Sequence, residues 1–258
     1  MIMIHPTALI DSKAKLADDV EVGAFSIIDA GVRIGAGTKI GPHAVITGRT
    51  TIGKNNHIFQ FTSIGEQPQD KKYAGEDTEL IIGDNNTIRE LCTISRGSMQ
   101  GGGITRIGSN NWIMACVHIA HDCMLGDDII MANNASLAGH VTIGNHAILS
   151  GYSLIHQFCT VGEYSFTSFA SHVNQSIPPY VTVSGEKARV KGINSEGLKR
   201  RGYTSEQISA VRRAYKALYR EGKPLEEAKA VLTEMAADSP EVQLMVDFLN
   251  SVERGIIR

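Results

Sequence analysis

The sequence contains no long apolar run. No stretch approaches the roughly 20 consecutive apolar residues that a membrane-spanning helix requires. The chain enters its main pattern at Ile4 without the basic and apolar regions of a secretory signal. We therefore expect a cytoplasmic protein with no membrane insertion.

The sequence also lacks an excess of either charge. Its 25 lysines and arginines nearly balance 27 aspartates and glutamates, and the isoelectric point of about 6.5 indicates no nucleic-acid partner. The four cysteines form no CxxC motif, which fits thiols that serve as apolar filler in a reducing compartment. They are Cys92, Cys116, Cys123 and Cys159.

What the sequence does contain is an aliphatic residue at every sixth position. This column runs unbroken over residues 4–64, resumes in phase over 82–94, and after a one-residue shift continues over 107–161. It fails at Thr167 and returns at Val173. Glycine often follows the aliphatic residue and Asn-Asn pairs recur, and both residue types tolerate tight corners.

A fixed six-residue period is typical of a parallel β-helix in which each hexad is a short strand and a turn. If three hexads complete one coil, residues one coil apart are stacked at the interstrand spacing of about 4.8 Å. The pattern of an aliphatic residue, a glycine and four variable residues resembles the hexapeptide-repeat acyltransferases. That resemblance implies a left-handed triangular prism, and we assign residues 1–187 to this all-β domain.

The pattern changes after the repeat. A pair of prolines ends it, because proline cannot donate to a strand ladder. From about residue 188 the apolar period becomes helical, which predicts a small all-α domain over residues 188–258. One helix begins at the capping box of Thr204 and Gln207, and two more begin near Pro224 and Pro240.

Two insertions interrupt the repeat. Residues 65–78 keep the register but carry Asp70 and Glu76 where the core needs aliphatic side chains, so this segment must leave the prism as a loop. Residues 97–106 break the phase and contain three consecutive glycines, without the strand and helix context of a phosphate-binding loop. Loops on a rigid scaffold often carry function, and we expect this of the first insertion. The second is predicted to be flexible.

Polar side chains converge at one edge of the predicted prism. One coil after His121 comes Gly139, and one coil later comes Gln157. A single histidine is usually structural, but this convergence over three adjacent coils predicts a functional site. Its members are His118, His121, Gly139, His140, His156 and Gln157, whereas His146 and His172 lie outside the column.

A Lys-Arg-Arg run at 199–201 lies between the prism and the helices. Such a run is usually a solvated face. Beside an active groove, however, the planar guanidinium of arginine is suited to binding phosphate.

Five segments together carry a closer resemblance. They read HIAHDC at 118–123, LAGHV at 137–141, HQF at 156–158, QDKKYAGE at 69–76 and NSEGLKRRGY at 194–203. Over its whole length the chain resembles the acyl-carrier-protein-dependent UDP-N-acetylglucosamine 3-O-acyltransferases. The resemblance implies transfer of a 3-hydroxyacyl chain from acyl carrier protein to the sugar 3-hydroxyl, the first step of lipid A biosynthesis. It also implies a homotrimer with sites between neighbouring prisms, no metal, and no cofactor beyond the phosphopantetheine that carries the acyl donor.

The resemblance assigns catalysis to His121, Asp122 and Gly139. His121 would take the proton of the attacking hydroxyl, a task that suits histidine because its ordinary pKa of about 6.5 lies near working pH. Asp122 would orient the imidazole, which requires a bend, since adjacent strand residues point to opposite faces. The backbone N–H of Gly139 would stabilise the oxyanion.

The resemblance also implies binding roles. Residues of the first insertion would hold the sugar hydroxyls, and residues near the Lys-Arg-Arg run would contact nucleotide, phosphate or carrier-derived groups. Lys72 and His121 are almost three coils apart, roughly 14 Å along one prism, so a site that uses both is easier to assemble across two chains. The sugar-binding residues would be Gln69, Asp70 and Lys72. The residues that position the nucleotide sugar and the acyl chain would be His118, His140, His156 and Gln157. The residues near the basic run would be Asn194, Glu196, Arg200 and Arg201.

Two phenylalanines bear on acyl-chain length. Phe166 and Phe169 lie beyond the far end of the expected groove, where a residue limits the chain in the resembling family. A bulky Phe169 predicts a medium-length 3-hydroxyacyl donor. The alternative is a ring that turns into the core or the trimer interface and limits nothing.

Three other functions remain open from the sequence. One is a hexapeptide-family N-acyltransferase or acetyltransferase that acts on a nucleotide amino sugar. Another is a zinc lyase of the γ-carbonic-anhydrase type, with His118, His121 and His140 as ligands. The last is a catalytically silent β-helix that only binds carrier protein or nucleotide sugar. Zinc analysis and a turnover assay separate these.

Overall fold

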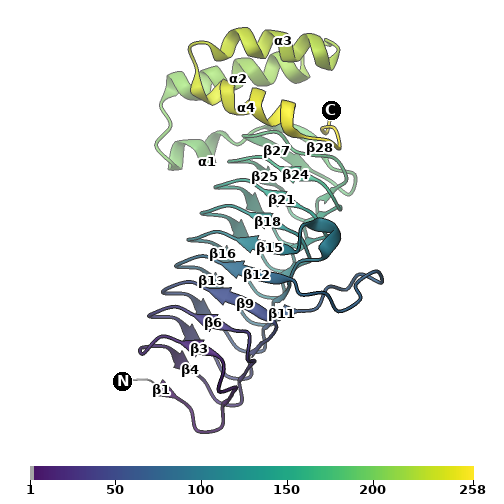
Figure 1. Ribbon diagram of the computed structural model, residues 1–258. Helices are drawn as coiled ribbons and strands as arrows, with labels where there is room; N and C mark the ends of the chain where they lie inside the picture. Colours follow the sequence, from purple (N-terminus) through teal and green to yellow (C-terminus); the bar gives the residue numbers. More distant parts are fainter. Residues whose placement is uncertain (1–2) are drawn as a thin grey trace.

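The computed structural model describes residues 3–258, which form a triangular prism capped by helices at its C-terminal end (Figure 1). Each coil adds one strand to each of three sheets, which have 11, nine and eight strands. Strands one coil apart pair in parallel, so the predicted left-handed parallel β-helix of hexapeptide repeats is confirmed.

The strands are short and follow one another around the prism. The 11-stranded sheet contains β1 (Met3–Ile4), β4 (Glu21–Val22), β7 (Lys39–Ile40), β10 (His57–Ile58), β13 (Thr87–Ile88), β16 (Trp112–Ile113), β19 (Ile130–Met131), β22 (Ile148–Leu149), β25 (Phe166–Thr167), β27 (Val181–Ser184) and β28 (Arg189–Ile193). The nine-stranded sheet contains β2 (Leu9–Ile10), β5 (Ile27–Ile28), β8 (Val45–Ile46), β11 (Ser63–Glu66), β14 (Thr93–Ser95), β17 (His118–Ile119), β20 (Ser136–Leu137), β23 (Leu154–Ile155) and β26 (His172–Val173). The eight-stranded sheet contains β3 (Lys15–Leu16), β6 (Arg33–Ile34), β9 (Arg49–Ile52), β12 (Glu79–Ile82), β15 (Ile104–Ile107), β18 (Met124–Leu125), β21 (Thr142–Ile143) and β24 (Thr160–Val161).

The aliphatic column forms the core of the prism. Ile28 pairs with Ile46 one coil on, and both are buried, whereas Leu9 at an outward position is exposed. Thr167, where the column fails, still points inward. It is fully buried, and its hydroxyl is 2.6 Å from the hydroxyl of Ser153, so a polar pair replaces an aliphatic contact there.

Residues in the left-handed conformation turn the corners. We call the corner between the eight-stranded and 11-stranded sheets the asparagine corner, because Asn55, Asn85 and Asn110 turn it with φ of 53°, 57° and 60°. The second asparagine of each of these three pairs is buried, and Asn86 Nδ2 donates to Asn56 Oδ1 over 3.0 Å. The three Asn-Asn pairs of this corner therefore combine a corner residue with a buried amide ladder.

Both insertions leave the prism at the corner between the nine-stranded and eight-stranded sheets, which we call the loop corner. The first lies between β11 and β12 and protrudes as a long loop, as predicted (Figure 1). The second lies between β14 and β15 and contains a 3₁₀ turn, η1 (Met99–Gly101). The chain passes the same corner again between β17 and β18 and between β20 and β21.

Four helices cover the C-terminal end: α1 (Ser195–Arg200), α2 (Ser205–Tyr219), α3 (Leu225–Ala236) and α4 (Pro240–Ser251). The predicted capping box at the start of α2 is present. Among residues 3–258, no helix is both long and apolar enough to cross a membrane.

The change from strand to helix comes later than the sequence predicts. Residues after 188 form β28, which pairs antiparallel with β27, so helical structure starts only at Ser195. The short helix α1 was not predicted; the side chain of Asn194 caps it by accepting a hydrogen bond from Gly197 N–H over 3.1 Å. A strand on the edge of a sheet carries no six-residue period, which explains the error.

Stacked aromatic rings join the last coils to the helices. At the asparagine corner the ring centroids of His146 and Tyr164 are 4.7 Å apart, and those of Tyr164 and Tyr180 are 5.6 Å apart. Tyr203, between α1 and α2, meets Tyr164 edge-on at 5.3 Å. Tyr180 is buried in the apolar cluster of the helices, together with Leu198, so one ring belongs to both parts.

Candidate active site

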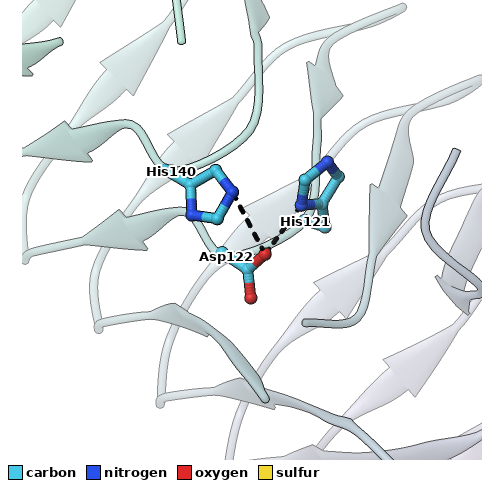
Figure 2. Close-up of side chains that lie close together, drawn as sticks. All are labelled: His121, Asp122 and His140. Atoms are coloured by element: carbon cyan, nitrogen blue, oxygen red, sulfur yellow. Dashed lines mark hydrogen bonds and ion pairs between the residues drawn. The ribbon is translucent and has the colours of Figure 1, made fainter. Parts of the chain in front are cut away.

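A histidine and an aspartate form a buried hydrogen-bonded pair at the loop corner (Figure 2). His121 Nδ1 lies 2.7 Å from Asp122 Oδ2. Asp122 has a φ of 61°, and this left-handed corner is the bend that brings two adjacent side chains together. Because a carboxylate only accepts hydrogen bonds, His121 Nδ1 is the donor, and Nε2 takes no part in this hydrogen bond.

The glycine-rich second insertion holds the carboxylate of Asp122. Ser98 donates to it twice, from N–H to Oδ1 over 2.7 Å and from the hydroxyl to Oδ2 over 2.6 Å. The Asp122 N–H in turn donates to Thr105 Oγ1 over 2.8 Å. The sequence predicts a flexible loop here, whereas the structure folds it into a turn that packs against Asp122. Ser98 and Thr105 were missed, because only the break in phase and the glycines marked this segment.

Gly139 and His140 lie one coil above the pair. A Cβ atom on Gly139 would lie 2.6 Å from His121 Cε1 and 2.8 Å from Nε2, so the ring has room only because residue 139 is glycine. The Gly139 N–H donates to no other group within residues 3–258. The His140 ring meets that of His121 edge-on, and its Nε2 is 3.7 Å from Asp122 Oδ2. The coil arithmetic of the sequence therefore brings these three residues together.

Burial sets the charge of two further histidines. It lowers the pKa of His140 from 6.5, against the opposing effect of the Asp122 carboxylate. Burial and the nearby His121 likewise lower the pKa of His118, whose Nδ1 is 2.7 Å from the hydroxyl of Thr93. Both rings therefore favour the neutral form, which adds no positive charge beside His121.

The next coil contributes a ring that the sequence did not suggest. Phe158 stacks on His140 with centroids 4.6 Å apart. His156 is exposed and donates from Nδ1 to the carbonyl of its neighbour Gln157 over 3.1 Å. The predicted edge thus continues through His156 and Gln157, and Phe158 adds a third ring after His121 and His140.

The first insertion extends beside this site. Asp70 is half-buried, and its charge acts to raise the pKa of His140, so it lies in the electrostatic range of the cluster. Gln69 and Lys72 are exposed side chains of the same loop. Arg96 fixes the loop base by donating to the carbonyl of Gly65 and the hydroxyl of Tyr73, each over 2.9 Å.

The remaining predicted residues gather on a different face. Asn194, Glu196, Arg200 and Arg201 line a cavity of about 630 Å³ between α1 and the outward side chains of β19, β22 and β25, which include Phe166. His121 and Asp122 do not line it. Within one chain, the basic cavity and the His121–Asp122 pair therefore lie on different surfaces.

Within the basic cavity the arginines differ in their contacts. Arg201 donates to His146 Nδ1 over 2.7 Å, which gives a partner to a histidine that the sequence set aside. Glu196 pairs with Lys199 over 2.8 Å, and this contact lowers the pKa of the Glu196 carboxyl. Arg200 makes no such contact within residues 3–258, so its guanidinium is free to bind an anion.

Phe169 is 68% exposed. Its ring meets that of Tyr152 at 5.5 Å and lies against Gly151. The ring therefore does not turn into the core of its own chain, which removes one of the two alternatives to an acyl-length role.

One cluster in residues 3–258 has the spacing of metal ligands, and it contains His121, Asp122 and His140. His118 is not part of it. The three-histidine zinc shell considered from the sequence is therefore not assembled within the chain.

A β-helix of hexapeptides with a buried His–Asp pair at one corner defines a hexapeptide-repeat transferase. The family model described as bacterial transferase hexapeptide (six repeats) matches residues 104–139, and that described as UDP N-acetylglucosamine O-acyltransferase, domain 2, matches residues 177–257. The first model covers the coils with the His–Asp pair, and the second covers the helical end.

Full-length relatives show which family of hexapeptide-repeat transferases the chain belongs to. Enzymes named acyl-(acyl-carrier-protein)–UDP-N-acetylglucosamine O-acyltransferase from Thiobacillus denitrificans and Herminiimonas arsenicoxydans are 59% and 56% identical, over 100% of both chains in each case. The crystal structure of the UDP-N-acetylglucosamine O-acyltransferase of Moraxella catarrhalis superposes with a TM-score of 0.98 at 47% identity, covering 99% of this chain and 100% of that one. The chain belongs to this family of acyl-carrier-protein-dependent UDP-N-acetylglucosamine O-acyltransferases.

We expect Asp122→Asn to lower the pKa of His140 further below 6.5. The Asp122 carboxylate favours the imidazolium form, so removing its charge favours the neutral ring. NMR titration of ¹³C-labelled histidine measures this pKa, with His140→Gln to assign the resonance. Asp127→Asn is the control, because Asp127 is not among the charges that act on His140. A pKa of His140 that stays or rises in Asp122→Asn contradicts the prediction.

Proposed function

We propose that this protein transfers a 3-hydroxyacyl chain from acyl carrier protein to the 3-hydroxyl of UDP-N-acetylglucosamine, the first step of lipid A biosynthesis. The observation that carries the proposal is the His121–Asp122 pair beneath Gly139. The names of full-length relatives at 56% to 59% identity support the choice of substrates.

His121 acts as the general base. Its Nδ1–H is held by Asp122, so Nε2 accepts the proton of the sugar 3-hydroxyl as that oxygen attacks the thioester carbonyl. The Asp122 carboxylate stabilises the imidazolium that forms. Because the pair is buried, this attraction acts in a medium of low effective dielectric constant.

The Gly139 N–H stabilises the oxyanion of the tetrahedral intermediate, since it has no partner within the described chain and lies beside His121. Collapse of the intermediate breaks the carbon–sulfur bond. The imidazolium of His121 returns the proton to the departing phosphopantetheine thiolate, which leaves the ester and the free thiol of the carrier.

The binding residues act on three parts of the substrates. Gln69, Asp70 and Lys72 hold the sugar, and the neutral rings of His118 and His140 position it with the acyl chain. His156 and Gln157 extend this surface by one coil. In the basic cavity Arg200 and Arg201, with Asn194 and Glu196, bind the nucleotide and its phosphates or the carrier-derived group.

The active form is a homotrimer whose sites lie between chains. The His121–Asp122 pair is at the loop corner, whereas the basic cavity is on the 11-stranded sheet and does not include that pair. At an interface between two chains, the His121–Asp122 pair of one chain faces the basic cavity of the next, and together they form one site. The protein works in the cytoplasm and needs no metal, and its acyl donor arrives on the phosphopantetheine of acyl carrier protein.

Phe169 limits the acyl chain to medium length. Its exposed ring closes the end of the groove that a smaller residue would leave open, while Phe166 lines the wall of the basic cavity. The neighbouring Tyr152 ring supports the blocking position.

We expect His121→Ala to reduce acyl transfer to UDP-N-acetylglucosamine by about 10²- to 10⁴-fold, the usual contribution of a general base. A panel of 3-hydroxyacyl carrier proteins of increasing chain length supplies the donors, and thiol release is followed. His43→Ala is the control, since His43 stacks between Phe25 and Phe61 at another corner.

Wild-type protein that transfers to no donor discards the O-acyltransferase assignment. The same preparation is then assayed with the 3-amino sugar nucleotide and with acetyl coenzyme A, and its zinc content is measured. Turnover with an amine acceptor identifies an N-acyltransferase, and stoichiometric zinc identifies the lyase.

Co-assembly of His121→Ala and Arg200→Ala chains tests the shared site. If one site combines His121 of one chain with Arg200 of the next, every mixed trimer has one intact site and about one third of the wild-type activity. Differently tagged chains are co-expressed and mixed oligomers isolated by two affinity steps. Mixed oligomers as inactive as the two parent variants contradict the shared site, and light scattering reports the oligomeric state independently.

We expect Phe169→Gly to shift the preferred donor to a longer 3-hydroxyacyl chain, because removing the ring lengthens the groove. The ratio of kcat/KM between long and medium donors measures the shift. Phe61→Leu serves as the control for loss of an exposed aromatic ring elsewhere, since Phe61 stacks on His43 at another corner. An unchanged donor preference in Phe169→Gly shows that Phe169 does not limit the length of the acyl chain.

A further inference from the structure

A second residue besides His121 holds the carboxylate of Asp122. Both of its oxygens accept hydrogen bonds from Ser98, one from the backbone N–H and one from the hydroxyl. Two donors on one residue, aimed at two oxygens, fix the plane of the carboxylate as well as its position. Oδ2 is shared between the Ser98 hydroxyl and His121 Nδ1.

The turn that presents Ser98 is closed on itself. The carbonyl of Ser98 accepts hydrogen bonds from Gly101 N–H over 3.0 Å and from Gly103 N–H over 2.8 Å. A Cβ atom on Gly97 would lie 2.2 Å from the Ile104 nitrogen, so the two ends of the turn touch. Only glycine permits this approach, which gives the glycines of the insertion a structural reason.

Gly101 presses the turn onto the carboxylate itself. A Cβ atom there would lie 2.1 Å from Cγ of Asp122 and 2.5 Å from each of its oxygens. Ser98 is 4% exposed and Asp122 is also 4% exposed. Water therefore has little access to this carboxylate, and the turn takes the place of solvent as its partner.

We propose that Ser98 is a positioning residue, which orients the Asp122 carboxylate so that the His121 imidazole keeps its proton on Nδ1 and its free Nε2 toward the substrate. This inference rests on the proposed function for its kinetic test. It assigns the second insertion to catalysis, although none of its side chains needs to contact the reacting atoms.

The kinetic test compares Ser98→Ala with Ser98→Thr and Gln100→Ala in the acyl-transfer assay. Loss of one hydrogen bond to a charged group lowers kcat by about 10- to 100-fold. KM stays almost unchanged, because Ser98 does not contact the substrate. Ser98→Thr keeps the hydroxyl and restores kcat, and Gln100→Ala, an exposed residue of the same turn, stays at the wild-type rate.

The pH–rate profile separates positioning from a structural role. Without the Ser98 hydroxyl, Oδ2 is a stronger acceptor for His121 Nδ1–H, which favours the imidazolium. The acidic limb of kcat/KM therefore moves to higher pH in Ser98→Ala and returns in Ser98→Thr. A variant that was merely destabilised loses melting temperature without moving this limb.

A spectroscopic test is independent of the substrate. In ¹⁵N-histidine-labelled protein, the hydrogen-bonded His121 Nδ1–H gives a downfield proton resonance, assigned by its absence in His121→Ala. We expect this resonance to move or broaden in Ser98→Ala and in Gly101→Ala, which displaces the carboxylate by contact while keeping both Ser98 donors. It stays in place in Gln100→Ala.

Two results overturn the proposal. One is a Ser98→Ala variant, folded by melting temperature, with wild-type kcat, pH profile and resonance. The other is a Ser98→Ala or Gly101→Ala variant whose loss of activity follows its loss of stability and whose resonance is unchanged. If the wild type transfers no acyl group, the proposed function fails, whereas the resonance still decides whether Ser98 positions the pair.

Discussion

Parallel pairing of strands one coil apart is the constraint on which the rest of the structure depends. It places each side chain about 4.8 Å above its equivalent in the previous coil, so a column at one corner is a continuous surface. From Phe25 onward many corners contain a residue in the left-handed conformation, and at the asparagine corner Asn55, Asn85 and Asn110 supply it. At the loop corner Asp122 and His140 adopt it instead, with φ of 61° and 60°, and the polar cluster forms there.

The two insertions show how this scaffold accommodates irregular chain. Each leaves the prism at the loop corner and returns in register, since β12 pairs with β9 below it and with β15 above it. The glycine-rich turn then folds back onto the carboxylate of Asp122. The repeat thus places Asp122 at the corner, and the insertion, which has no repeat, supplies the hydrogen bonds that orient its carboxylate.

The sequence predicted what the period governs. The aliphatic column, the corner residues and the placement of Gly139 above His121 all follow from counting coils. Ser98 lies in an insertion with no period, so nothing in its spacing indicated a hydrogen bond to Asp122. β28 was missed for the same reason, since an antiparallel edge strand breaks the count. Arg200 lies apart from His121 because the basic cavity is on the 11-stranded sheet and His121 is at the loop corner. The sequence does not show which sheet the residues after the repeat pack against, so this separation could be seen only in the structure.

The ring of Tyr180 has a consequence for how the chain folds. It completes the aromatic stack of the asparagine corner and also lies inside the apolar cluster of the helices. Neither part is then a closed unit: the last coil without the helices exposes an aromatic ring to water, and the helices without the coil lose one of the buried rings of their core. The boundary between strand and helix is therefore only a change of secondary structure. We expect the C-terminal coils and the helices to fold and unfold together as one cooperative unit.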